Sequence, residues 1–85
     1  MNERKRRDNA LPLDKMKEGT LLRIVSISRT SGIGQQLAQM GIQVGDTVQI
    51  KRFASFGGPI LIETRGTSLA LSKEWAEKIT VELVL

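Results

Sequence analysis

One segment, residues 32–46, contains a helix pattern followed by a defined stop and a turn, and it interrupts a chain whose remaining apolar residues follow strand patterns. The apolar side chains of its first part share one helical face: Ile33, Leu37 and Met40. Gln35 and Gln39 lie on the opposite face. A stripe of this kind packs against a larger apolar surface, which in this chain must be a sheet. We therefore expect one α-helix over about residues 32–41, resting on β-structure.

The sequence also predicts where this helix begins and ends. Thr30 or Ser31 is the expected N-cap, because a side-chain oxygen there can accept a hydrogen bond from the first turn. Gly41 stands where a left-handed residue ends a helix. Ile42 follows it, at the position that contacts Leu37 in a Schellman motif. The helix is therefore expected to stop at a defined residue and turn directly into a strand.

The other patterned segments are short strands bounded by turn residues. They cover residues 21–28, 47–51, 60–64, 67–71 and 79–84. In the first strand Ile24 and Ile27 have opposite parity, so both face a core only if a bulge lies near Val25 or Ser26. Short helical turns are expected near residues 13–17 and 73–78. The predicted fold class is mainly β: a small, strongly bent barrel of about five strands with one inserted α-helix.

The core of such a barrel is expected to be aliphatic. The residues predicted to face inward are Ile24, Ile27, Val48, Ile50, Ile62, Leu69, Leu71, Ile79, Val81 and Leu83. We place the domain at residues 11–85, since a chain of 85 residues forms one small domain. Residues 1–10 carry four basic and two acidic side chains, half of the net charge of +4, and are expected to form a disordered basic tail.

Several function classes can be set aside on composition. The chain has no cysteine and no histidine, which removes thiol chemistry, the commonest metal ligand and the commonest general base. Its nine Asp and Glu residues are scattered, so we expect no catalytic site, no cofactor and no ferrous-iron site. No apolar run approaches the roughly 20 residues that span a bilayer. A cytoplasmic protein that does not itself span a membrane is the expectation.

Several motifs in order resemble FeoA domains. They are Leu-Ala-Gln-Met-Gly-Ile at 37–42, Val-Gly-Asp at 44–46, Gly-Gly-Pro at 57–59 and Leu-Ser-Lys-Glu-Trp-Ala-Glu-Lys-Ile at 71–79. The resemblance covers about residues 11–85. It departs from the family at Ser55 and Ser72, where the family often has Pro and Arg.

This resemblance implies an SH3-like barrel and a protein without enzymatic activity. It further implies a cytosolic accessory of the FeoB ferrous-iron transporter, a membrane protein whose soluble portion is a GTP-binding domain. Transition-metal binding is a term attached to the family, but this chain lacks the residues that usually supply it.

The candidate contact residues lie on two surfaces. Phe53 and Phe56 belong to a glycine-rich connection, where a small core can hardly bury both and an exposed aromatic can anchor a partner. The glutamines of the outward helix face offer donors and acceptors, and Arg29 precedes the helix on a polar loop. The predicted partner-binding residues are Gln35, Gln36, Gln39, Phe53, Phe56 and Arg29. Burial of Phe53 in the core and simple solvation of the polar side chains remain the structural alternatives.

Three functions remain open at this point. The first is a protein-binding module for the transporter's GTP-binding portion, as a monomer or weak oligomer. The second is a small nucleic-acid-binding barrel, suggested by Lys51-Arg52-Phe53, although the chain holds only three aromatic residues and no nucleic acid is expected. The third is a self-associating scaffold.

Overall fold

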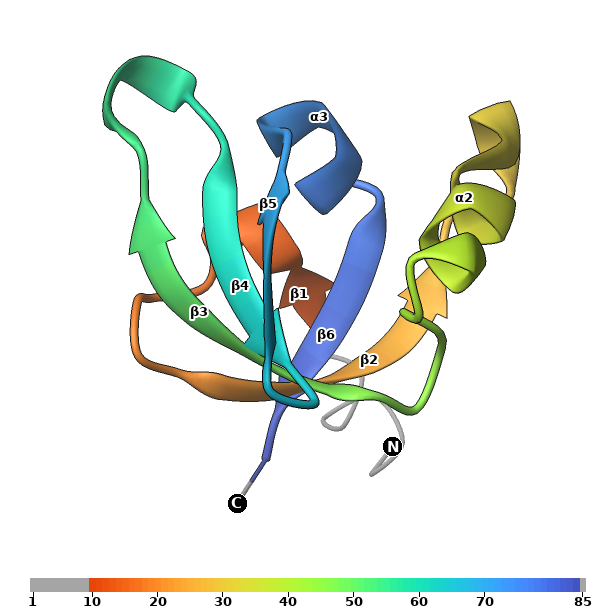
Figure 1. The fold of residues 1–85 in the computed structure, drawn as a ribbon, viewed down its shortest axis with the longest axis horizontal. Coiled ribbons are helices and arrows are strands. Elements are labelled where there is room, and N and C mark those ends of the chain that lie inside the picture. Colours follow the sequence, from red (N-terminus) through yellow and green to blue (C-terminus); the bar gives the residue numbers. More distant parts are fainter. Residues whose placement is uncertain (1–9, 85) are drawn as a thin grey trace, which may run out of the picture.

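The alternating segments pair into one bent antiparallel sheet in the computed structural model, which describes residues 10–84 (Figure 1). The order of the strands across the sheet is β1-β6-β2-β3-β4-β5. Their bounds are β1 Leu11–Pro12, β2 Leu21–Ile27, β3 Thr47–Phe53, β4 Ile60–Thr64, β5 Thr67–Leu71 and β6 Ile79–Leu83. The predicted mainly-β barrel is confirmed, with one strand more than expected. The additional strand is β1, whose two residues pair with β6.

Strand β2 carries the predicted bulge. Its pairing with β6 shifts register between Ile24 and Ser26, so that the extra residue lets Ile24 and Ile27 both turn toward the core. A second shift, between Ile50 and Arg52, bends β3 against β4. These two irregularities let a sheet of short strands curl around its own apolar face.

The core is aliphatic, as predicted, and it includes residues from almost every element. Its buried members are Leu13, Leu22, Ile24, Ile33, Leu37, Ile42, Val48, Ile50, Ile60, Ile62, Leu71, Ala76, Ile79 and Val81. Ile27 and Leu69 are partly buried against this cluster. Leu83 was expected to face inward but is 48% exposed, although it still pairs with Leu22 of β2.

Helix α2 (Ile33–Gln39) packs through Ile33 and Leu37, both buried. Met40, expected on the same stripe, is 41% exposed because the helix has already ended there and the chain is reversing. The predicted Schellman motif is present: Gly41 N–H donates to the Ala38 carbonyl and Ile42 N–H to the Leu37 carbonyl, at 3.0 and 2.8 Å. Gly41 has a φ of 87°, the left-handed geometry that this motif requires.

Short helical turns close the ends of the barrel. They are η1 (Leu13–Lys15), η2 (Thr30–Gly32), η3 (Ser55–Gly57) and α3 (Lys73–Ala76). η1 and α3 correspond to the two turns predicted from the sequence. Ser72 caps α3, its hydroxyl accepting from the Trp75 N–H at 3.1 Å. The proposed disordered tail, residues 1–10, lies outside the described residues except for Ala10.

Candidate functional site

The three predicted glutamines lie together on the outer side of α2. Gln35, Gln36 and Gln39 are all exposed, and with Gly32 and Met40 they line a depression of about 540 Å³. Glutamine amides present both donors and acceptors, so this surface is neutral and suited to hydrogen bonding with a polar partner. The structure therefore groups these three residues as the sequence predicted.

The beginning of α2 differs from the prediction. The residue at the N-cap is Gly32, with a φ of 66° and no side chain to cap the helix, so neither Thr30 nor Ser31 occupies that position. The Thr30 hydroxyl instead hydrogen-bonds with the Ser28 hydroxyl at 2.8 Å. The 3-10 turn η2 (Thr30–Gly32) takes up the predicted cap positions, so the cap of α2 lies one or two residues later than predicted. Arg29 is exposed at the start of η2 and does not line the depression beside α2.

The second predicted surface is the tip of the β3–β4 hairpin. Phe53, at the end of β3, is partly buried and packs against the core, so it belongs mainly to the fold. Phe56 is fully exposed, with a relative exposure of 106%. Its φ of 58° and ψ of 41° place a bulky side chain in the left-handed region, which is uncommon for any residue except glycine. The two phenylalanines therefore have different roles.

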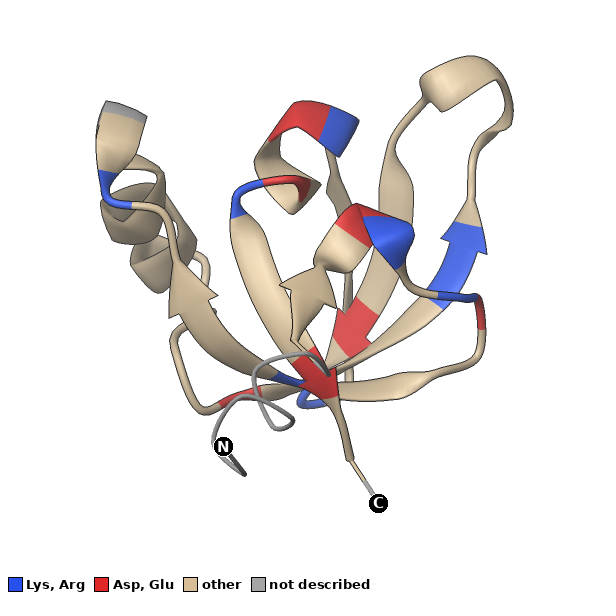
Figure 2. Ribbon diagram, turned by 180° about the vertical axis from the view of Figure 1, so that it is seen from behind, with Lys and Arg blue, Asp and Glu red and all other residues tan. Residues whose placement is uncertain are grey.

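The glutamine surface and the hairpin tip are not adjacent. In Figures 1 and 2, helix α2 and the tip of the β3–β4 hairpin lie on either side of α3, at the same end of the barrel. The depression beside α2 is lined by α2, its C-cap and Gly32 alone. The predicted contact residues thus form two separate patches, and a partner that touches both must also cover α3.

A cavity beside the hairpin tip is lined by a residue that was not among the predicted site residues. Asp14, in η1, has a side chain only 2% exposed, and neither carboxylate oxygen has a hydrogen-bond partner among residues 10–84. The cavity measures about 190 Å³ and is lined by Asp14, Phe53, Ala54, Gly57, Gly58, Ile60 and Lys73. These residues come from distant parts of the chain, so no local motif in the sequence announces the cavity.

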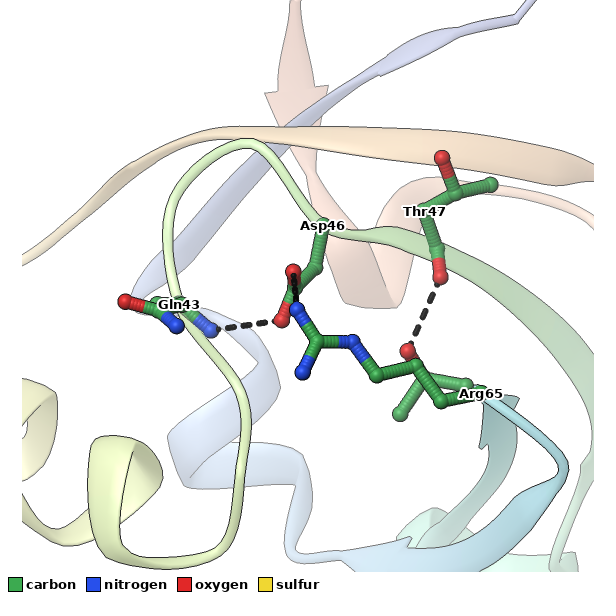
Figure 3. Close-up of polar contacts among 5 residues, drawn as sticks. Gln43, Asp46, Thr47 and Arg65 are labelled. Carbon is green, nitrogen blue, oxygen red and sulfur yellow. Dashed lines mark hydrogen bonds and ion pairs between the residues drawn. The ribbon is translucent and has the colours of Figure 1, made fainter.

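A second polar feature was also missed: Asp46 joins two loops (Figure 3). Its Oδ2 accepts from the Gln43 N–H at 2.9 Å, and its Oδ1 accepts from Arg65 Nη2 at 2.7 Å. Asp46 is 8% exposed, whereas the Arg65 side chain remains 63% exposed. The contact holds the linker that follows α2 against the β4–β5 turn, so its role is to support the fold. In the sequence, Asp46 is marked only by the Val-Gly-Asp pattern, and no pattern indicates that Arg65 is its partner.

Metal ligands do not gather anywhere in the described part of the chain. Within residues 10–84, no group of three or more His, Cys, Asp or Glu side chains is close enough together to hold an ion. In the same residues, every helix is too short and too polar to cross a membrane.

Comparison with known proteins gives a consistent family. The family model described as "FeoA domain" matches residues 11–83. A curated relative from Methanocaldococcus jannaschii, provisionally named Fe(2+) transport protein A, is 35% identical over 71 residues, which is 84% of each chain.

Solved structures share the fold. The chain is similar to the FeoA-like protein from Clostridium acetobutylicum, with a TM-score of 0.82 and 30% identity, covering 91% of this chain and 90% of that one. It also resembles a manganese-dependent transcriptional repressor, with a TM-score of 0.82 and 20% identity over 88% of this chain and 42% of that one. At that identity the second likeness concerns the fold alone.

Proposed function

The chain belongs to the FeoA domain family, and from that premise we propose that it is a non-enzymatic accessory protein of ferrous-iron transport. In this proposal it works in the cytoplasm as a protein-binding module, and its partner is the GTP-binding portion of a FeoB-like membrane transporter. The named relative from M. jannaschii supports the link to Fe(2+) transport.

The observation that carries the binding role is the state of Phe56. A fully exposed phenylalanine on a hairpin tip contributes nothing to a core, and its left-handed backbone costs about 1–2 kcal/mol. A residue that is both exposed and strained is more readily explained by a contact than by folding. Exposed aromatics of this kind are common anchors of protein interfaces, where one side chain fills a pocket of the partner.

The polar part of the proposed interface is the glutamine surface of α2 together with Arg29. Both patches lie at the end of the barrel that also carries α3 (Figure 1). A single partner surface laid across this end reaches Phe56 on one side and Gln35 and Gln39 on the other. A folded domain provides such an extended surface, which supports a protein as the partner.

The charge distribution does not favour the nucleic-acid alternative. Basic and acidic residues are interspersed over the barrel in Figure 2. Lys51, part of the basic and aromatic run, already pairs with Glu63 at 3.3 Å, and Arg23 pairs with Glu82 at 3.8 Å. A nucleic-acid surface requires basic side chains that are free to neutralise phosphates. Phe53, the aromatic of that run, packs against the core.

Substitution of Phe56 tests the proposal. Phe56→Ala should weaken binding to the purified soluble portion of a FeoB-like transporter by about thirtyfold, since truncating an interface anchor costs about 2 kcal/mol. Titration calorimetry measures the affinity, and differential scanning calorimetry the thermal midpoint. The midpoint should stay within a few degrees of the parent, because the removed ring touches no core residue.

Phe53→Ala is the matched control. The same truncation on the same hairpin removes a ring that packs against the core, so it should lower the thermal midpoint. Unchanged affinity in Phe56→Ala would contradict the proposed anchor. Unfolding of that variant would show that Phe56 stabilises the domain in solution.

A further inference from the structure

Asp14 is the most unusual charged group in the described part of the molecule. Its carboxylate is withdrawn from water, and among residues 10–84 both oxygens are unbonded and the nearest cation is Lys15 Nζ, at 3.9 Å from Oδ2. The Lys15 side chain is 64% exposed, so its ammonium is largely solvated and compensates the buried charge only weakly. Leaving an acceptor buried and unbonded is unfavourable, because its lost hydration is not replaced. A group kept in this state at such a cost marks a position where a ligand can supply the missing hydrogen bonds.

The cavity around Asp14 has the shape of a small receptor site. Phe53 and Ile60 provide apolar walls, and the backbone of Gly57 and Gly58 provides another. Gly58 is packed so closely that a Cβ would lie 2.9 Å from the Ala54 Cβ, so the backbone there tolerates no side chain without a shift. The space of about 190 Å³ is sufficient for the planar end of one long side chain. Its walls are formed mainly by apolar side chains and the hairpin backbone, with the Asp14 carboxylate and the Lys73 side chain also lining it.

The chemistry of the cavity selects its ligand. The two carboxylate oxygens have no hydrogen-bond partner among residues 10–84. They match the paired N–H groups of a guanidinium, which donates to both at once when the surrounding side chains move aside to uncover them. A metal ion fits poorly, because a single carboxylate is far from the several ligands that an ion needs and no acidic cluster occurs in residues 10–84. An anion is disfavoured by the carboxylate itself. The lysines near the cavity, Lys15 and Lys73, are exposed and have long flexible stems, so they can move into solvent when a cation arrives.

We propose that this cavity receives an arginine side chain from a protein partner, with Asp14 as its bidentate acceptor. A protein rather than a free small molecule is favoured because the hairpin tip that forms one wall also carries the fully exposed Phe56. Aromatic side chains and arginines are enriched among the few residues that carry most of the binding energy of a protein interface. The inference rests on the proposed function only in taking the partner to be a protein.

A peptide titration tests the site without the transporter. The probe is the blocked tripeptide Ala-Arg-Ala, followed by amide chemical shifts of the 15N-labelled protein, and the comparison peptide carries citrulline, a neutral side chain of nearly the same shape. The arginine peptide should shift the amides of Asp14, Gly57 and Gly58 in a saturable manner. The citrulline peptide should bind at least tenfold more weakly, and Asp14→Asn should weaken the arginine peptide to the same extent.

Glu77→Gln is the matched control, since it removes one carboxylate from an exposed position next to α3. This variant should bind the arginine peptide as the parent does. Equal affinity for the two peptides, or binding that survives Asp14→Asn, overturns the proposal. So does a loss in Glu77→Gln as large as that in Asp14→Asn, which would show attraction to overall charge.

The thermal midpoint separates a ligand site from a structural role. If Asp14 has no partner within the folded chain, Asp14→Asn should leave the midpoint unchanged or raise it. A fall of several degrees in Asp14→Asn, matched by a similar fall in Lys73→Met, would mean that these two residues pair in solution and that the cavity is not free. If the arginine peptide does not bind, the proposed function is not affected, because the Phe56 experiment tests it separately by measuring binding of the transporter directly.

Discussion

Asp46 and Arg65 show how individual residues hold this small fold together. The two side chains are separated by 19 positions in the sequence, yet their atoms meet at 2.7 Å. Arg65 has a φ of 55°, a geometry that is unfavourable for a residue with a side chain. The position would suit Asn or Gly better in a two-residue hairpin turn. The ion pair with Asp46 offers a compensation for this local cost.

A set of substitutions at these two positions separates charge from hydrogen bonding. Asp46→Ala should destabilise the fold by about 2 kcal/mol, because it leaves the Gln43 N–H without its acceptor and removes the ion pair. Asp46→Asn keeps an acceptor for Gln43 and should cost about half as much. A double-mutant cycle with Arg65→Ala, measured by urea unfolding, should give a coupling of about 1 kcal/mol, since Arg65 is mostly exposed. Additive effects would show that the pair contributes nothing beyond its separate residues.

At the scale of elements, α2 is the part of the fold that its own sequence determines most fully. The burial of Ile33 and Leu37, the end at Gly41 and the strand that follows were predictable, because each depends on residues a few positions apart; Met40, the third predicted residue of the stripe, is exposed. The beginning of α2 was not, because the intervening turn η2 can be formed by many polar sequences. Strand β1 was not predicted for another reason. Its two residues are too few to show a periodic pattern, and they form a strand only because they pair with the distant β6.

Substitutions near the end of α2 test whether its own residues determine where the helix stops. Gly41→Ala should destabilise the domain by about 1–2 kcal/mol, because alanine must adopt the left-handed geometry. In a domain of this size, each kcal/mol lowers the thermal midpoint by roughly 4–8 °C. Gly34→Ala is the control within the same helix. It has ordinary helical geometry, and its new methyl group would lie 3.8 Å from Ile27, so it should raise stability by about 0.5–1 kcal/mol.

The candidate sites were predictable where they depend on neighbouring residues, and not where they depend on residues far apart in the sequence. Exposure of Phe56 and clustering of the three glutamines were predicted, since a glycine-rich tip and a helical face are local patterns. The cavity around Asp14 was not predicted, because its walls come from η1, the β3–β4 hairpin, β4 and α3. Burial of an acidic side chain is a property of the assembled molecule and leaves no mark on the neighbouring sequence.

At the scale of the whole molecule, the absence of histidine and cysteine limits what the protein can do with iron itself. Anaerobic titration calorimetry with Fe(II) should show no stoichiometric site with micromolar affinity, because the carboxylates of residues 10–84 do not converge. A one-to-one micromolar site would contradict this expectation. If such a site were found, repeating the titration with Asp14→Asn would show whether the buried carboxylate of Asp14 is one of its ligands.

The strand order has a consequence for how the protein is made. Strand β6 lies between β1 and β2, so the segment synthesised last among the strands occupies an interior place in the sheet. Until residues 79–83 leave the ribosome, β1 has no partner and one side of β2 stays open. Such non-local pairing slows folding, because distant segments must be brought together before their contacts form. A nascent chain paused before Ile79 therefore exposes an unpaired edge, and it is during synthesis that this domain most needs protection from aggregation.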